Sequence, residues 1–224
     1  MCLGYITART CSSAVKVSVN PYVILLLGAL PDIDIVFESL GLGHRTVTHS
    51  ALFWSIVFIP VFVEYGKRGL PYFVATIQHI VVGDLIVGRV NPVWPFFDNE
   101  LGLGVHLTSF ENIVLEGVSL VLFFILVWKN MDYRMFLGVA RRRLWSLVTL
   151  IPLLAFLLFL SLGSSLPLLA VDNLTNSLGS IVRWVFRSDF MPAVIVMHLL
   201  LAVFLLASVV KGSKPALTRM RTRE

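Results

Sequence analysis

Long apolar runs alternate with short polar clusters along this chain, and the runs predict helices that cross a membrane. Crossing about 30 Å of hydrocarbon takes roughly 20 apolar residues in a helix, and about 17 is a practical minimum. Six runs reach or approach this length, over residues 13–30, 49–63, 70–90, 112–128, 144–163 and 190–210. The pattern therefore predicts an all-α fold, a polytopic transmembrane helix bundle of about six spans.

Two stretches of this pattern are less regular. The run 49–63 is short and contains Pro60, which favours a tilted or kinked helix. Residues 164–188 are apolar but are interrupted by Asp172, Asn173, Asn176 and Arg183. This interruption is typical of an amphipathic stretch that lies at the membrane interface.

Composition and charge agree with an integral membrane protein. The 224 residues are 57% hydrophobic and 14% charged, with a mean hydropathy of +0.87, which is more apolar surface than a soluble domain of this size buries. The net charge of +5 does not indicate nucleic-acid binding, because the basic residues form short clusters between the apolar runs. Placing most of these clusters on the cytoplasmic side predicts a multi-pass protein of the cell membrane with both termini in the cytoplasm.

The segment "LPDIDIVFESLGLGHRTVTHS", residues 30–50, concentrates polar side chains in the first predicted external loop: Asp32, Asp34, Glu38, His44, Arg45 and His49. Imidazoles and carboxylates together are ligands for zinc, manganese or iron. Asp32 and Asp34 point toward one site only if "PDID" is extended, which Pro31 favours. Thr48 or Ser50 is expected to cap the helix that follows.

The third apolar run contains a second polar pair, His79 and Asp84. An ionisable side chain inside a membrane costs several kcal/mol and is by default a candidate for function. Five residues correspond to about 140° on an α-helix, so the two side chains converge only at a local bulge, which Gly83 permits, or only one of them is a ligand. Structural ion pairs, Asp84 with Arg89 and Arg45 with Asp32 or Asp34, are the alternative.

"LPDID", "GHRTVTHS" and the run with His79 and Asp84, followed by "NPVWPF", together resemble the YdjM family over roughly residues 21–98. Its members are inner-membrane proteins described as membrane-bound metal-dependent hydrolases. The resemblance implies that the metal ligands are Asp32, Asp34, His44, His49, His79 and Asp84 and that the cofactor is a divalent metal, zinc before manganese or iron. It also suggests a distant likeness to zinc-dependent phospholipase C.

Three positions depart from this family's pattern. Family members often carry a histidine near the N-terminus, whereas residues 1–43 contain none. The residue after "LPDID" is often histidine, and here it is Ile35. The pair in the third run is often spaced His-x-x-x-Asp, whereas four residues separate His79 from Asp84.

The resemblance and the ligand types together predict hydrolysis of a phosphoester or a lipid-linked substrate at the outer face of the membrane, with membrane lipids as partners. Asp34 and Arg45 are the candidate catalytic residues, because a carboxylate can act as a general base and a guanidinium, like that of Arg89, can hold a phosphate. Residues 1–128 would form the membrane-embedded metal-hydrolase core, and residues 129–224 an additional transmembrane region with a basic cytoplasmic loop and tail. The alternatives are an ion- or proton-coupled transporter that uses His79 and Asp84 and a non-catalytic scaffold with a degenerate site.

Overall fold

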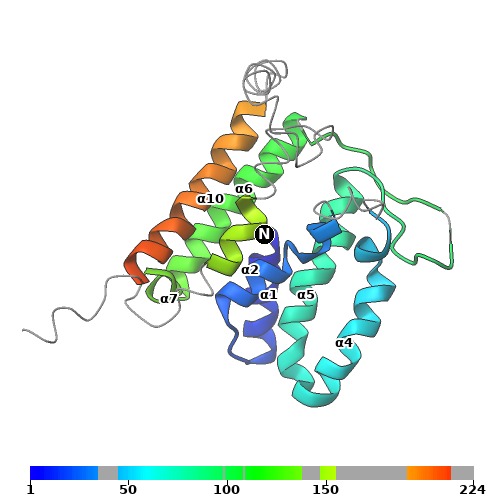
Figure 1. The fold of residues 1–224 in the computed structure, drawn as a ribbon, viewed down its shortest axis with the longest axis horizontal. Coiled ribbons are helices and arrows are strands. Elements are labelled where there is room, and N and C mark those ends of the chain that lie inside the picture. The colour runs from blue at the N-terminus through cyan, green and yellow to red at the C-terminus, as the bar shows by residue number, and fades with distance from the viewer. Residues whose placement is uncertain (35–44, 98, 108, 138–146, 155–190, 213–224) are drawn as a thin grey trace, which may run out of the picture.

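Figure 1 shows the computed structural model, which describes residues 1–34, 45–97, 99–107, 109–137, 147–154 and 191–212. Within these residues the regular structure is helical, apart from one isolated β-bridge between Val90 and Leu101. The named helices are α1 (Cys2–Val15), α2 (Pro21–Leu27), η1 (Leu30–Ile33), η3 (Val47–His49), α4 (Ala51–Tyr65), η4 (Gly66–Gly69), α5 (Leu70–Gln78), η5 (His79–Asp84), α6 (Phe110–Lys129), α7 (Tyr133–Leu137) and α10 (Met191–Gly212). The predicted all-α class is confirmed for this part of the chain.

The first predicted span, residues 13–30, is wrong as a continuous helix. Lys16 adopts a left-handed conformation (φ 55°) and ends α1, and its backbone N–H donates to the carbonyls of Ser12 and Ser13. Asn20 then caps α2 by accepting a hydrogen bond from the backbone N–H of Tyr22 at 3.0 Å, and Pro21 occupies the first helical position. The apolar run therefore contains the end of one helix, a turn and a second helix of 7 residues, which is too short to cross a bilayer.

The second and third runs form helices near their predicted positions. Ser50 caps α4, because its hydroxyl accepts a hydrogen bond from Phe53 N at 3.2 Å. Helix α5 continues through η5 to residue 86, four residues before the predicted end at residue 90. The chain turns away at Gly88, whose φ of 107° favours glycine.

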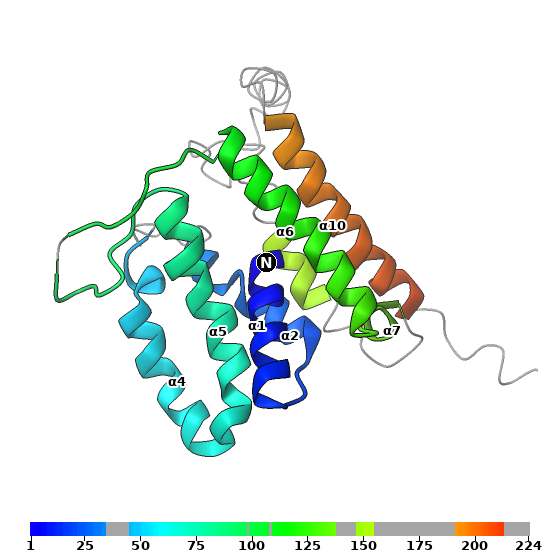
Figure 2. The same cartoon turned by 180° about the vertical axis from the view of Figure 1, so that it is seen from behind.

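Two helices, α6 and α10, are long and apolar enough to cross a membrane, the only two that pass this test in the described part of the chain. They correspond to the runs predicted at 112–128 and 190–210. They lie side by side and run in the same direction (Figures 1 and 2), with Phe123 and Phe124 of α6 packed against Phe204 of α10. Of the run predicted at 144–163, residues 147–154 are described and are helical, and the interfacial stretch 164–188 lies outside the described residues.

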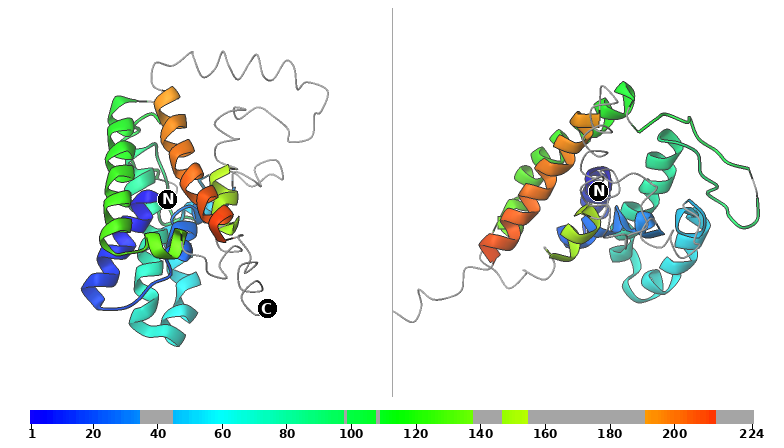
Figure 3. Two further views of the ribbon diagram at one scale, coloured as in Figure 1. Left: turned by 90° about the vertical axis from the view of Figure 1, so that its left-hand side faces the viewer. Right: turned by 45° about the horizontal axis from the view of Figure 1, so that its top comes forward.

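Helix α1 lies between α5 and α6 (Figures 1 and 3). It therefore joins the pair α4 and α5 to the pair α6 and α10. At the turn after α6, Asp132 accepts hydrogen bonds from Tyr5 and Arg9 of α1. Near its N-terminus, α1 also meets the end of α2 so closely that a Cβ added to Gly4 would lie 2.8 Å from the Cα of Gly28. This crossing supports the elements that carry the polar residues described next.

Candidate metal centre

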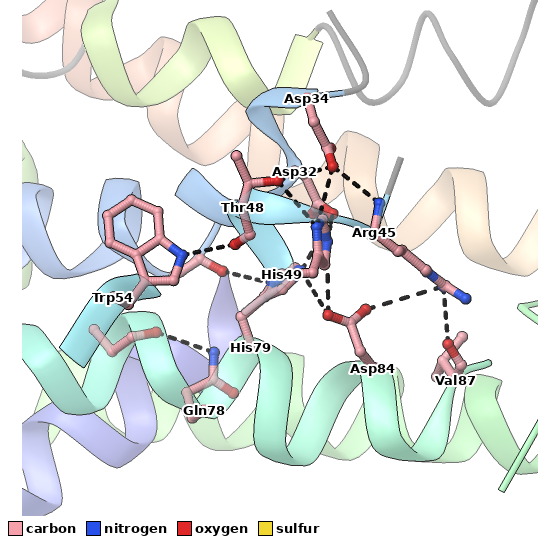
Figure 4. A network of polar contacts seen from close by, with 12 residues as sticks. Asp32, Asp34, Arg45, Thr48, His49, Trp54, Gln78, His79, Asp84 and Val87 are labelled. Atoms are coloured by element: carbon pink, nitrogen blue, oxygen red, sulfur yellow. Dashed lines mark hydrogen bonds and ion pairs between the residues drawn. The ribbon is translucent and has the colours of Figure 1, made fainter. Parts of the chain in front are cut away.

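Three short helices, η1, η3 and η5, bring Asp32, His49 and His79 together (Figure 4). The Oδ1 atom of Asp32 lies 3.4 Å from Nε2 of His49 and 3.2 Å from Nε2 of His79. Three potential ligand atoms, one from each residue, lie within 4.8 Å of one another, and His49 is fully buried. Residues separated by 47 positions in the sequence therefore face one point.

Asp84 joins this group because η5 is a π-helix. In a π-helix the backbone hydrogen bonds run from i to i+5, so residues five apart are separated by roughly one turn and lie on one face. The Oδ2 atom of Asp84 is 3.8 Å from Nε2 of His79 and 3.6 Å from Nε2 of His49. The bulge that the sequence required for convergence is present and includes Gly83.

Asp34 occupies a different position from Asp32. The "PDID" segment is a 3₁₀ turn and not extended, because Pro31 lies in the first turn of η1, where the backbone angle that its ring imposes fits a helix. Asp32 therefore faces the Nε2 edge of His49, whereas Oδ2 of Asp34 lies 3.1 Å from Nδ1 on the other edge of the same ring. Asp34 is 3% exposed.

The same Oδ2 atom of Asp34 also accepts hydrogen bonds from Arg45 N at 3.0 Å and from the hydroxyl of Thr48 at 2.8 Å. Thr48 thus contacts the site, although its position suggested a helix cap, and its carbonyl accepts a hydrogen bond from Nε1 of Trp54 at 2.6 Å. These contacts fix the turn that carries His49 against the start of α4.

The Nδ1 atoms of both histidines, on the side of each ring that faces away from the cluster, lie next to hydrogen-bond acceptors. Nδ1 of His79 lies 3.1 Å from the carbonyl oxygen of Gly28, and Nδ1 of His49 faces the carboxylate of Asp34. Since a carbonyl can only accept, Nδ1 of His79 carries the proton, and in the neutral ring the lone pair is on Nε2. Metal-binding histidines usually have this arrangement, in which a carbonyl or carboxylate fixes the ring and the other nitrogen faces the ion.

The residues present fit a divalent cation. An imidazole lone pair that faces a carboxylate oxygen is repulsive unless a proton or a cation lies between them. The Oδ2 atom of Asp84 is buried and accepts no hydrogen bond from the described residues, although it faces both imidazoles. Zinc ligand distances of about 2.0–2.1 Å give ligand–ligand edges of about 3.3 Å in a tetrahedron. The four edges observed here, 3.2, 3.4, 3.6 and 3.8 Å, are close to that value.

The electrostatics show how strongly this group attracts positive charge. Burial by itself raises the pKa of Asp32, but the imidazoles of His79 and His49 outweigh burial and hold this pKa well below its usual range. Burial by itself lowers the pKa of His49, which precedes α4, but hydrogen bonds to Asp32 and Asp34 outweigh it and raise the pKa to about 9. A divalent ion and these protons compete for the same ring nitrogens.

Arg45 lies at the edge of the group. Its Nη2 atom donates to the carbonyl of Val87 at 2.9 Å and lies 3.9 Å from Oδ1 of Asp84, so this arginine pairs with Asp84 and only its backbone reaches Asp34. The guanidinium packs against Gly88, where an added Cβ would overlap it. The Arg45 side chain is 32% exposed, which leaves part of the guanidinium accessible to a ligand.

Some residues fall outside this arrangement. Arg89 is exposed on the chain that follows η5, and the predicted pair between Arg89 and Asp84 is replaced by Arg45 with Asp84. His44, like Glu38, lies outside the described residues. Sequence reasoning missed Gly28, because its contribution is a backbone carbonyl and no residue type identifies such a group.

A family model described as YdjM inner membrane protein matches residues 1–166. The match extends beyond the 21–98 expected from the motifs and includes α1 and α6 as well as the four residues that converge. No curated protein and no solved structure is significantly similar to this chain.

Proposed function

Because the chain belongs to the YdjM inner membrane protein family, we propose that it is a membrane-bound metal-dependent hydrolase that acts on a phosphoester or lipid-linked substrate. The observation that carries this proposal is the convergence of two imidazole Nε2 atoms and two carboxylates, with both outer Nδ1 atoms facing acceptors. A buried ion pair would satisfy one carboxylate per histidine, whereas here each Nε2 faces two.

The proposed ligands are Asp32, His49, His79 and Asp84, and zinc is the first candidate metal, with manganese or iron as alternatives. We assign Asp34 a positioning role, because it is buried against the outer edge of His49. His44 stays a predicted ligand from the sequence.

When bound, a divalent ion would supply Lewis acidity, which lowers the pKa of water and polarises a phosphoryl oxygen. The chain's own residues prepare the site for it. Gly28 and Asp34 hold protons on the outer nitrogens of His79 and His49, so the Nε2 lone pairs face inward. Arg45, anchored on Val87, is placed to hold a non-bridging oxygen of a phosphate.

In the membrane we propose that α4 and the continuous helix α5–η5 cross together with α6 and α10, as parts of a multi-pass bundle; α4, with 15 residues, would cross where the bilayer thins around it. The turn at Lys16, the basic helix η4 and Lys129 would face the cytoplasm, and the metal site would lie toward the outer face. The common direction of α6 and α10 supports one further crossing between them. The carbonyl of Met1 lies beside Gly28, at the opposite end of α1 from the turn at Lys16.

Metal content tests the proposal. We expect a stoichiometric transition metal, measured by mass spectrometry, in detergent-purified protein, and its loss in His49→Ala and Asp84→Asn. Glu100→Gln, which changes an exposed carboxylate, is the matched control and should keep the metal. Wild-type protein without metal after metal-replete purification would contradict the proposal and favour a scaffold. Bound metal without hydrolysis of any phosphodiester or phospholipid would exclude the proposed hydrolase activity and would leave the proposed metal site standing.

A further inference from the structure

Five large apolar side chains are exposed among the described residues between Val90 and Gly104, which form no helix. These are Val93 (38% exposed), Phe96 (73%), Phe97 (61%), Leu101 (54%) and Leu103 (78%). Three of them, Val93, Phe97 and Leu101, line a hollow of about 250 Å³ together with Asn91, Pro92 and Asn99. Exposed apolar patches of this kind mark contacts with membranes or proteins, because contact of apolar surface with water is unfavourable.

The base of this segment is fixed to η5 and to α4, which begins just after His49. On one side, Leu103 N donates to the carbonyl of Leu85 at 2.7 Å and Gly104 N to that of Gly88 at 2.9 Å. On the other side, the hydroxyl of Ser50 donates to the carbonyl of Trp94 at 2.9 Å. The position of the segment therefore determines the position of the elements that carry Asp84 and His49.

The segment also lies close to a membrane boundary. The candidate span α6 begins at Phe110, about six residues after Gly104, and a chain of this length reaches about 20 Å at most. Irregular backbone with free amides does not enter hydrocarbon unless it is covered by protein. Apolar side chains, in contrast, gain free energy by leaving water. The headgroup region of the bilayer satisfies both requirements, since water there solvates the backbone while side chains reach the acyl chains.

We propose that residues 93–97 and 99–103 belong to an interfacial loop, which inserts Phe96, Phe97 and Leu103 into the headgroup region of the membrane that α6 crosses. The occupant of this apolar surface is the lipid bilayer. Because the base of the loop is hydrogen-bonded to the ends of η5 and α4, the loop sets the depth of the polar cluster below the membrane surface. This inference does not depend on the proposed hydrolase activity.

Depth-dependent fluorescence quenching tests this proposal on the full chain in phosphatidylcholine vesicles. A single cysteine at Phe97→Cys, in a Cys2→Ala and Cys11→Ala background, carries an environment-sensitive fluorophore, and Phe96→Cys provides a second position. We expect an emission maximum at shorter wavelength than in water, strong quenching by lipids with a spin label near the headgroup, and weak quenching by aqueous iodide. Glu100→Cys in the same loop is the matched control. Its label should be quenched strongly by aqueous iodide and weakly by the spin-labelled lipids.

Each other outcome overturns the proposal. Quenching of both loop positions by iodide alone would place the loop in water. Protection of the Phe97 and Phe96 labels from iodide and from spin-labelled lipid would show that protein covers the loop, either a second copy of this chain or a partner. Equal melting temperatures for the labelled variants and the cysteine-free background show that the comparison is made on folded protein.

Discussion

Replacing Asp34 by asparagine separates two roles for this residue, ligand and positioning group. The backbone N–H of Arg45, the hydroxyl of Thr48 and the ring of His49 all meet the same atom, Oδ2, at 3.0, 2.8 and 3.1 Å. An asparagine whose carbonyl oxygen takes this place keeps these three contacts, removes the negative charge and places an NH2 group where Oδ1 was. The variant therefore changes the electrostatic support of His49 with little change in shape.

The magnitude follows from this geometry. Loss of a group that orients a metal-binding histidine typically lowers metal affinity by about 10–100-fold, or about 1.4–2.8 kcal/mol. Thr48→Val removes one donor to Asp34 and keeps the carboxylate, so a smaller loss of about 0.5–1.5 kcal/mol is expected. Competition between the purified protein and a chromophoric zinc chelator measures both values, with Glu100→Gln as the control.

Two results would refute the reasoning. An Asp34→Asn variant that binds zinc as tightly as wild type would show that Asp34 does not support His49. Complete loss of binding, as expected for His49→Ala, would show that Asp34 is itself a ligand, as the sequence suggested.

Three further predictions concern stability and site geometry. If a metal occupies the site, a chelator should lower the melting temperature, because a ligand present at 100 times its dissociation constant stabilises the folded state by about 2.7 kcal/mol; an unchanged melting curve would count against the site. Gly4→Ala should destabilise the protein by about 1–3 kcal/mol and weaken metal binding, because the new Cβ would lie 2.8 Å from the backbone of Gly28, whereas Gly117→Ala makes an ordinary 3.6 Å contact and should change neither. Gly88→Ala should displace the guanidinium of Arg45 and cost about 1–2 kcal/mol of backbone strain at a φ of 107°. We expect this variant to keep its metal and to bind a phosphate analogue more weakly than wild type. Equal binding of the phosphate analogue would exclude Arg45 as the anion site.

Much of the candidate site could be predicted from the sequence, because its side chains are of types that are rare in an apolar chain. His79 and Asp84 stand out inside a hydrophobic run, and helix geometry alone indicated that only a bulge lets them meet. The π-helix at η5 supplies that bulge. The carbonyl of Gly28, by contrast, carries no signature in the sequence, because every residue has such a group.

The helix boundaries were harder to predict from the sequence than the site residues, because hydropathy measures how apolar a run is and not where the backbone turns. The left-handed Lys16 and the Asn20 cap divide the first run, although both lie within or beside apolar residues. In "PDID" the tendency of proline to disfavour helix at the preceding residue predicts an extended segment, whereas the compatibility of proline with the first turn of a helix decides the structure. Both errors concern single residues at helix ends, which averages over long windows do not resolve.

The short hairpin of α1 and α2 has a consequence for biogenesis. With 14 and 7 residues, neither helix is long enough to be inserted across the bilayer as an independent span. Its buried residues, such as Tyr5 and Tyr22, pack against helices that are synthesised later, including α6. This hairpin is synthesised before α6 and is thus expected to dock only after α6 has been made. Since Gly28 belongs to this hairpin, His79 receives its backbone support only when the bundle is complete, and a truncated or misinserted chain would lack a finished site.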